Sequence, residues 1–305
     1  MSSLPLRVAY FGLPLGALAL HQAGVSPCVI ALGHPDAPGA RRVRRTFAHG
    51  TLVLARPDLT STEVLRAISS ARPDVILSWF WPFLIPQDVL DLAPRGAFGV
   101  HPSLLPRWRG PDPYFWALFR GDAYSGVTLH RLAREYDTGD IVAQHRIAIA
   151  PALNAWTLAK RLDSPSLRLF VEAAQQLGRG EPLAGVAQEE GTASAAPSPD
   201  DELQTLRWQA EASEIVNLVR ALAPHPGAAT TLGSEPVEVL SAVVYDGRVP
   251  RVLEVGDAVM ATQGVVIRAG EGAVLIRRVR RENGQQLSGV EVGQLFAGGL
   301  FKLPW

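Results

Sequence analysis

Short apolar runs alternate with amphipathic segments along the first third of the chain. Runs of four or five apolar residues predict buried strands, and apolar residues spaced three and four apart between them predict helices. The expected strands cover residues 7–11, 29–32, 51–55, 74–78 and 97–100, and the expected helices cover 15–23, 61–71 and 87–92. Strands alternating with helices are typical of a doubly wound, mostly parallel sheet that binds ligands at the carboxyl ends of its strands. The pattern therefore predicts an α/β, Rossmann-like fold.

The pattern changes twice after this region. A helix over 113–119, paired strands over 125–131 and 141–149, and a long amphipathic helix over 156–177 complete a first domain, residues 1–178. Gly, Ala, Ser, Pro and Glu then dominate residues 179–201, which predicts an extended linker. Beyond it, a helix over 212–223 is followed by short strands over 237–244, 252–255, 264–269 and 273–279. Short strands joined by glycine turns predict a smaller β-barrel (OB-like) domain over residues 202–305.

Composition narrows the class of protein. The 305 residues carry 29 acidic and 29 basic side chains and 47% hydrophobic residues, as in ordinary globular proteins. Zero net charge gives no global attraction to nucleic acid or to an anionic membrane, although a local basic patch is compatible with it. No signal peptide or membrane-length apolar run is visible, so we expect a cytoplasmic protein without a membrane partner. One cysteine and histidines without ligand spacing predict no metal site.

Two side chains suited to acid–base chemistry lie in loops that follow expected strands. His101 stands in the glycine- and proline-rich segment 96–110, and Asp137 stands in segment 135–140. Such loops often hold catalytic pairs. Taken alone, however, Asp137 could serve only as a turn residue beside Thr138 and Gly139. The same sequence patterns favour half-buried or surface positions for the strand histidines His130 and His145.

Two further groups of residues leave two interpretations open. The aromatic run 79–83 fits either core packing or stacking on a planar ligand. The four arginines of segment 41–45 fit a solvated helix face, with an anion site for a folate tail, a nucleotide phosphate or tRNA as the alternative.

Three motifs together resemble a known family. They are FGVHPSLLPRWRG over residues 98–110, GVTLHRL over 126–132 and DTGDIVAQHRIAI over 137–149. This combination is similar to the 10-formyltetrahydrofolate-dependent formyltransferases, and the similarity runs from about residue 73 to 151. In amino-acid sequence, the motifs are most similar to the formyltransferase domain that acts on UDP-4-amino-4-deoxy-L-arabinose. The linker and the C-terminal strands fit the plan of the methionyl-tRNA formyltransferases.

The resemblance implies a reaction and roles for named residues. The expected reaction transfers a formyl group from 10-formyltetrahydrofolate, a co-substrate, to a primary amine without a metal. His101 matches the family histidine, Asp137 matches the aspartate that orients or charges it, and Ser103 would support the loop and hydrogen bond to His101. The expected folate contacts are Trp81, Phe83, Leu84 and Ile85, with Tyr136, Thr138 and Asp140 opposite. Arg109, Pro111 and Asp112 are the expected contacts to the amine acceptor.

Gly99 departs from the family pattern, which has asparagine two residues before the histidine. Glycine has no side-chain donor for the tetrahedral oxyanion, and losing one such donor costs about 3 to 4 kcal/mol, a hundred- to a thousandfold in rate. Three outcomes remain open. Another donor substitutes, namely His101 as imidazolium, a backbone amide, Ser103 or a water in the vacated space; the site serves a different acyl donor or reaction; or the protein binds without catalysing.

The sequence also weighs the acceptors against one another. The wording of the motifs and the absence of net positive charge favour an amino-sugar nucleotide or another small amine of specialised metabolism. Methionyl-tRNA is the alternative, favoured by the C-terminal domain and disfavoured by the short segment 37–51, where the tRNA enzymes carry a longer basic insertion.

Overall fold

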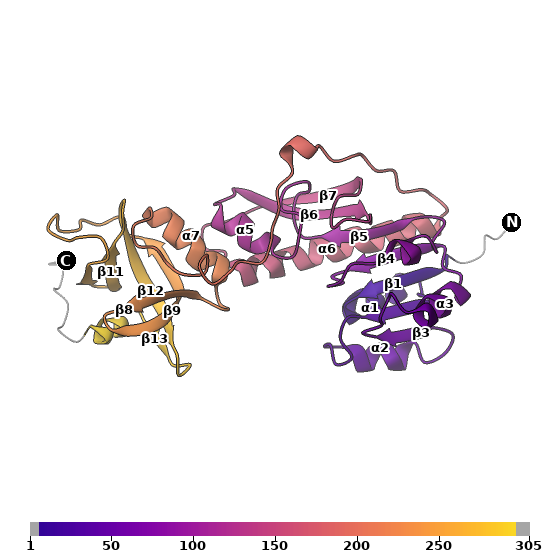
Figure 1. The fold of residues 1–305 in the computed structure, drawn as a ribbon, viewed down its shortest axis with the longest axis horizontal. Coiled ribbons are helices and arrows are strands. Elements are labelled where there is room, and N and C mark those ends of the chain that lie inside the picture. The colour runs from indigo at the N-terminus through magenta and orange to yellow at the C-terminus, as the bar shows by residue number, and fades with distance from the viewer. Residues whose placement is uncertain (1–5, 297–305) are drawn as a thin grey trace. The chain divides into compact units, whose positions relative to one another are not determined.

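The structure is a computed structural model, and it describes residues 6–296 (Figure 1). It falls into two compact units. Among the described residues, the first contains 6–111, 125–147 and 161–195, and the second contains 112–124, 148–160 and 196–296. By packing, two segments of the expected first domain, 112–124 and 148–160, therefore belong with the C-terminal residues. No helix among residues 6–296 has the length and apolar character needed to cross a membrane.

A seven-stranded sheet organises the N-terminal half of the chain, and its strand order is β3-β2-β1-β4-β5-β6-β7. The strands are β1 (Val8–Gly12), β2 (Val29–Leu32), β3 (Leu52–Ala55), β4 (Val75–Trp79), β5 (Ala97–His101), β6 (Tyr124–Arg131) and β7 (Ile141–Ala148). The first five run parallel, and β6 joins β5 antiparallel. This confirms the expected Rossmann-like, mostly parallel sheet. The intervening helices are α1 (Pro14–Gln22), α2 (Ala40–Thr46), α3 (Thr62–Ser70) and α4 (Gln87–Leu90).

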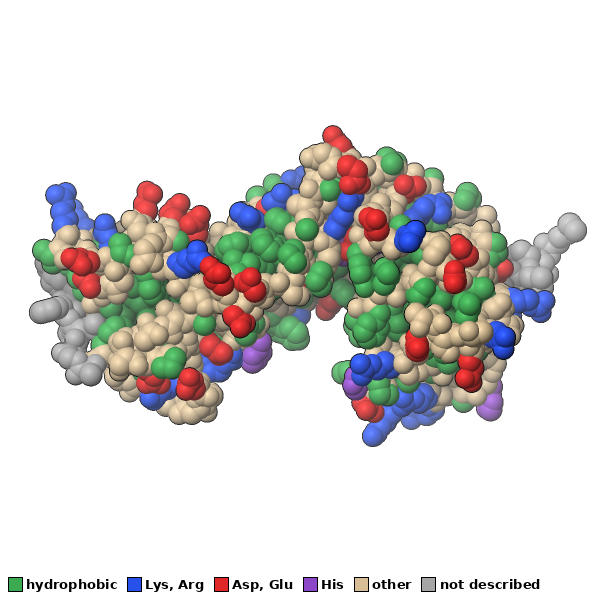
Figure 2. Space-filling view, in the orientation of Figure 1, with side chains coloured by type: hydrophobic (Ala, Val, Ile, Leu, Met, Phe, Trp, Pro, Cys, Tyr) green, Lys and Arg blue, Asp and Glu red, His purple; other side chains and the backbone are tan. Residues whose placement is uncertain are grey.

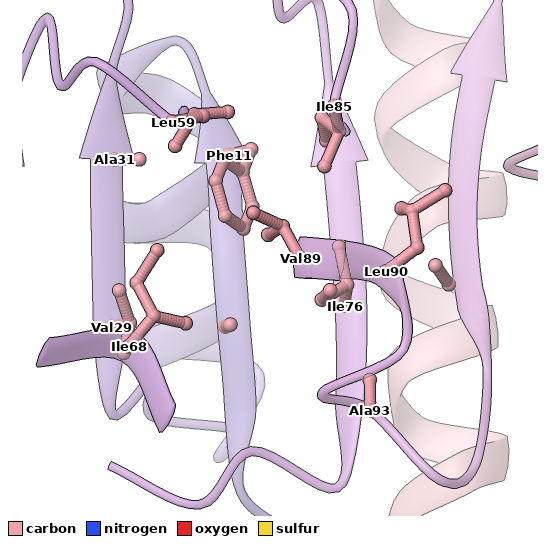
Figure 3. Packing of buried hydrophobic residues seen from close by; sticks show 12 residues of the cluster. Phe11, Val29, Ala31, Leu59, Ile68, Ile76, Ile85, Val89, Leu90 and Ala93 are labelled. Atoms are coloured by element: carbon pink, nitrogen blue, oxygen red, sulfur yellow. The ribbon is translucent and has the colours of Figure 1, made fainter. Parts of the chain in front are cut away.

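Both faces of the central strands β1, β2, β4 and β5 are buried, as expected for strands that are mostly apolar rather than alternating. On one face Phe11, Val29 and Ile76 pack against Ile68 of α3 and Val89 of α4 (Figure 3). On the opposite face the ring of Tyr10 lies 5.8 Å from that of Phe170 in α6 (Ala155–Gly178). The sheet is thus held between helices, which leaves its strand ends for ligands.

The second unit holds α5 (Pro113–Phe119), α7 (Ala212–Leu222) and a six-stranded antiparallel sheet. Its order is β10-β11-β12-β9-β8, with β13 paired to β12. The strands are β8 (Ala228–Leu232), β9 (Glu235–Val244), β10 (Ala258–Ala261), β11 (Gly264–Arg268), β12 (Ala273–Arg281) and β13 (Gln286–Ser288). Short 3₁₀ turns occupy Glu190–Thr192 and Glu291–Leu295.

The expected strand over 252–255 is wrong. This stretch forms two successive turns, in which the amide of Leu253 donates to the carbonyl of Pro250 and that of Asp257 donates to Glu254. The carboxylate of Asp257 also accepts the amide proton of Glu254 at 2.8 Å. Proline and aspartate at these positions favour turns over the sheet that the valines would favour. The strand, β10, begins only at Ala258.

Candidate functional site

The topology of the larger sheet indicates where a ligand binds. The chain leaves β1 toward β2 on one side, and β4 lies on the other side of β1. Such a reversal between neighbouring strands opens a crevice at their carboxyl ends, where doubly wound proteins bind their ligands. His101 is the last residue of β5, the next strand along from β4. The sheet therefore places His101 beside this crevice.

The loops after β1 and β4 carry exposed apolar side chains. Leu13 and Leu15 follow β1, and Phe83 and Leu84, which are 44% and 42% exposed, follow β4. The other two expected folate contacts turn inward. Ile85 is part of the buried cluster, and the ring of Trp81 lies 5.5 Å from that of Phe11. The core-packing interpretation thus holds for Trp81, whereas stacking of the aromatic run on a planar ligand stays a prediction.

His101 is held on both of its ring nitrogens. It is 7% exposed, and its Nε2 lies 2.8 Å from the carbonyl oxygen of Trp108. A carbonyl only accepts, so this nitrogen carries the proton of the neutral ring. Its Nδ1 faces Oδ2 of Asp137 at 3.4 Å. The structure therefore brings the two expected acid–base residues together and leaves Nδ1 as the basic nitrogen.

Asp137 lies in the left-handed region of backbone conformation, which aspartate tolerates better than most other non-glycine residues. Its φ is 58°, and Trp108 and Phe80, which starts the loop after β4, have φ values of 64° and 52°. Non-glycine residues in the left-handed region cost free energy and gather at functional sites. The backbone N–H of Gly110 donates to Oδ2 of Asp137 at 2.9 Å. The carboxylate thus joins the two motif loops instead of capping its own turn.

His130 was not expected at the site. It is 2% exposed, and its Nε2 lies 3.6 Å from Oδ1 of Asp137, the oxygen that His101 does not face. Burial lowers the pKa of His130 to about 4, against the opposing attraction of Asp137. The antiparallel register that pairs Gly99 with His130 brings it here. The expectation of a half-buried or surface residue is wrong for His130, whereas His145 on β7 is half-buried.

We expect His130 to make the protein less stable in acid. Its native pKa lies below the ordinary value of 6.5, so between these values the unfolded chain binds a proton that the folded chain does not. The free energy of unfolding should fall by about 2 to 3 kcal/mol between pH 7 and pH 4.5 through this group. Urea unfolding at both values, for the wild type and His130→Gln, measures it. Equal pH dependence in the two proteins would contradict the expectation.

Ser103 does not bond to His101 as expected. Its hydroxyl is buried and donates to the carbonyl oxygen of Arg107 at 2.7 Å. The side chain thereby closes the loop whose next residue, Trp108, accepts from His101. Ser103 therefore supports the loop without contacting the imidazole.

Leu132 fills the space beside Gly99. A Cβ atom added to Gly99 would lie 2.7 Å from Cδ2 of Leu132 and 3.7 Å from Cβ of Ser78. No vacated space for a water replaces the asparagine side chain at this point. That part of the sequence interpretation is wrong because Leu132, the residue after β6, supplies an apolar side chain there.

Residues 186–196, named the strap, lie against the motif loops rather than forming a free tether. Val186 pairs with Ile141, and Ala195 pairs with Arg109. The side-chain amide of Gln188 donates from Nε2 to the backbone carbonyls of Asp137 and Gly139, each at 2.7 Å. The strap therefore fixes the loop that carries Asp137.

Arg109, an expected acceptor contact, is bound by the strap. Its guanidinium donates to Oε1 of Gln188 at 3.0 and 2.8 Å and pairs with Glu190 at 2.7 Å. Paired carboxylate and guanidinium raise the pKa of Arg109 and lower that of Glu190. Arg109 thus reaches an acceptor only by releasing these partners.

The other expected contacts lie as follows. Pro111 and Tyr136 are exposed, and Asp140 is half-buried. Thr138 donates its hydroxyl to the carbonyl of Glu135 at 3.2 Å. The backbone N–H of Asp112 donates to Ala196 at 3.0 Å, and its carboxylate accepts from the hydroxyl of Ser198.

Replacing Gln188 with alanine should loosen the Asp137 loop. Two carbonyls and the guanidinium of Arg109 lose a partner, so we expect a loss of about 1 to 3 kcal/mol in unfolding free energy. Activity should fall with it, because the loop that carries Asp137 loses both of these hydrogen bonds. Glu189→Ala, an exposed neighbour, is the matched control. Denaturant unfolding of both variants decides; equal stabilities would show that the strap does not hold the loop.

Comparison with known proteins divides the chain near the expected linker. The family described as formyl transferase matches residues 18–174, and the one described as formyl transferase, C-terminal domain, matches residues 200–296. A methionyl-tRNA formyltransferase of Paraburkholderia phymatum is 33% identical over 303 residues, 92% of each chain. One of Ralstonia pickettii is 33% identical over 323 residues, 96% of this chain and 98% of the other.

Solved structures share the fold at low identity. A sugar 3N-formyltransferase, WlaRD, matches with TM-score 0.68 and 15% identity, over 93% of this chain and all (100%) of that one. HypX of Aquifex aeolicus in complex with tetrahydrofolic acid matches with TM-score 0.65 and 20% identity, over 99% of this chain. The chain spans about half of HypX, 50% of its length.

Proposed function

This chain belongs to the formyltransferase family, and we propose that it transfers a formyl group from 10-formyltetrahydrofolate to the primary amine of methionyl-tRNA. The observation that carries the proposed chemistry is the contact between His101 and Asp137 beside the β1–β4 crevice. The proposed acceptor rests on the relatives that match both halves of the chain.

The reaction needs a base at one point. The amine nitrogen forms a bond to the formyl carbon, the bond from that carbon to N10 of the folate breaks, and one proton passes from the amine to N10. An imidazole can carry this proton. His101 offers Nδ1 for it, because Nε2–H is bound by Trp108. Asp137 stabilises the resulting imidazolium from 3.4 Å.

Exposed apolar side chains beside the crevice suit a flat, partly apolar ligand such as a pterin. Phe83 and Leu84 from one loop and Leu13 and Leu15 from the other expose apolar surface at the carboxyl ends of β4 and β1. Nε1 of Trp81 is a buried donor without an acceptor among the described residues. Apolar walls with a few unpaired polar groups are typical of small-molecule sites. We infer that the folate is held here.

A basic helix favours a polyanionic acceptor. Arg41, Arg42, Arg44 and Arg45 are all exposed on α2, and Figure 2 shows basic side chains gathered in this part of the molecule. A Cβ atom on Gly39, just before α2, would lie 3.2 Å from Pro14, the first residue of α1. The helix therefore begins at the crevice edge of the sheet, where arginines could contact phosphates.

An amino-sugar nucleotide is the second candidate acceptor. It is favoured by the wording of segments 126–132 and 141–149, which resembles a nucleotide-sugar enzyme, and by the zero net charge. The two candidates differ in size and charge, so one assay separates them.

The test supplies 10-formyltetrahydrofolate with methionyl-tRNA in one reaction and with a UDP-linked 4-amino sugar in another, and follows tetrahydrofolate release. We expect release with methionyl-tRNA that declines as salt rises, since phosphate contacts are screened. Release only with the amino sugar would overturn the acceptor. No release with either, while folate still binds, would overturn the proposed activity.

A further inference from the structure

Two imidazoles face one carboxylate at this site. On β5 and β6 the register sets Gly99 opposite His130 and His101 opposite Thr128. Residues two apart on a strand share a face, so His101 and His130 point to the same side of the sheet. Their ring centres are 6.5 Å apart, with Asp137 contacting both.

Backbone carbonyls fix the tautomers of both rings. Nδ1 of His130 lies 2.8 Å from the carbonyl oxygen of Arg131, and Nε2 of His101 lies 2.8 Å from that of Trp108. Because carbonyls only accept, these two nitrogens hold the ring protons. Each neutral ring therefore turns a bare nitrogen toward Asp137, at 3.6 Å for His130 and 3.4 Å for His101.

With both rings neutral, no proton lies between Asp137 and either of the ring nitrogens that face it. An ionised Asp137 would meet two nitrogen lone pairs, and only one contact would relax if a single proton lay between carboxylate and ring. The backbone N–H of Gly110 satisfies one lone pair on Oδ2 and leaves Oδ1 to His130. Removing the lone pair on His130 would make the surroundings of Oδ1 less negative, and so weaken the hold of the carboxylate on a proton.

The other charges near Asp137 do not replace His130. The guanidinium of Arg109 interacts electrostatically with Asp137 and with Glu135, but its hydrogen bonds go to Gln188 and Glu190. Glu135 is exposed in the same loop. The strong burial of His130 favours its neutral form near pH 7, with a lowered pKa. A proton taken up by these three side chains near pH 7 therefore goes to His101 or Asp137.

We propose that His130 is a positioning residue of the formyl-transfer site, which raises the proton affinity of the His101–Asp137 pair by presenting a lone pair to the second oxygen of Asp137. This inference rests on the proposed function for its catalytic meaning. The role of His130 is to set the basicity of His101; contact with the substrates is left to His101.

The test is a titration of ¹⁵N-labelled imidazoles by NMR, in the wild type and in His130→Gln. In the wild type, His130 should remain in the Nδ1–H form at pH 7 and His101 in the Nε2–H form. A glutamine amide at position 130 can donate a hydrogen bond to Oδ1 of Asp137, where the wild-type histidine presents a lone pair. We expect the titration midpoint of His101 to fall by about one pH unit, a tenfold loss in proton affinity. His145→Gln, outside the cluster, should leave it unchanged.

The rising limb of kcat/KM against pH should move down by the same amount, with kcat reduced and KM for the folate unaltered. An unchanged His101 midpoint in folded His130→Gln would overturn the proposal. If that variant fails to fold, the wild-type spectra decide: a protonated Nε2 on His130 at pH 7 would overturn the proposal, and a bare one supports it. The spectra need no substrate. A protein that shows the expected shift of the His101 midpoint but no formyl transfer would therefore refute only the proposed function.

Discussion

Replacing His101 with alanine lowers kcat/KM for formyl transfer about a thousandfold, within the range general-base catalysis contributes. The variant loses the Nδ1 that faces Asp137 and the donor that binds the carbonyl of Trp108. Folate affinity should stay within a factor of two or so, because the apolar crevice after β1 and β4 is intact. Steady-state rates and calorimetric folate binding measure the two effects.

His145→Ala is the matched control, because His145 is a half-buried strand histidine whose Nδ1 lies 3.4 Å from Nη2 of Arg168. It should retain near-wild-type rates. Asp137→Asn provides an independent check, since it keeps the size of the side chain and removes the charge beside both imidazoles. A His101→Ala protein that is folded and as fast as the wild type would remove this histidine from the mechanism.

Restoring asparagine at Gly99 should raise the rate once room is made for it. Its Cβ would lie 2.7 Å from Cδ2 of Leu132, so the single variant Gly99→Asn should lose about 1 to 3 kcal/mol of stability. Combined with Leu132→Ala, the amide gains space and supplies an oxyanion donor. Because such a donor is worth about a hundred- to a thousandfold, we expect kcat to rise at least about tenfold over Leu132→Ala alone.

Single-turnover formyl transfer by the double variant and by Leu132→Ala makes the comparison, with unfolding curves to separate stability from chemistry. Leu132→Ala is the required reference because it creates the same space without the donor. If the double variant is no faster than this reference, another group already stabilises the oxyanion and Gly99 is not the limiting position.

The buried parallel sheet could be predicted from the sequence because its strands are local apolar runs, as in residues 29–32 and 97–100. The C-terminal strands were harder. β8 contains Thr230 and Thr231, which interrupt the apolar pattern, and the valines of 252–255 lie in turns set by Pro250 and Asp257. Local composition there indicates the type of structure better than its position.

The candidate site divides in the same way. His101 and Asp137 could be identified because each sits in a motif of its own. The positions of His130 and Leu132 depend on the register between β5 and β6, which no local pattern specifies. The partners of Arg109 lie 79 and 81 residues further along the chain, in a segment whose composition predicts a linker. Contacts of this range come from tertiary structure, so the sequence could not supply them.

One labelling measurement tests whether the His101–Asp137 pair transfers a formyl group from folate. The protein is incubated with 10-formyltetrahydrofolate carrying ¹³C in the formyl group and with methionyl-tRNA, and the label is followed by NMR. We predict that wild-type protein moves the label into an N-formyl amide and that His101→Ala does so about a thousandfold more slowly. Label that stays on the folate with the wild type would contradict formyl transfer by this protein. Label that moves equally fast with His101→Ala would contradict the role of the His101–Asp137 pair.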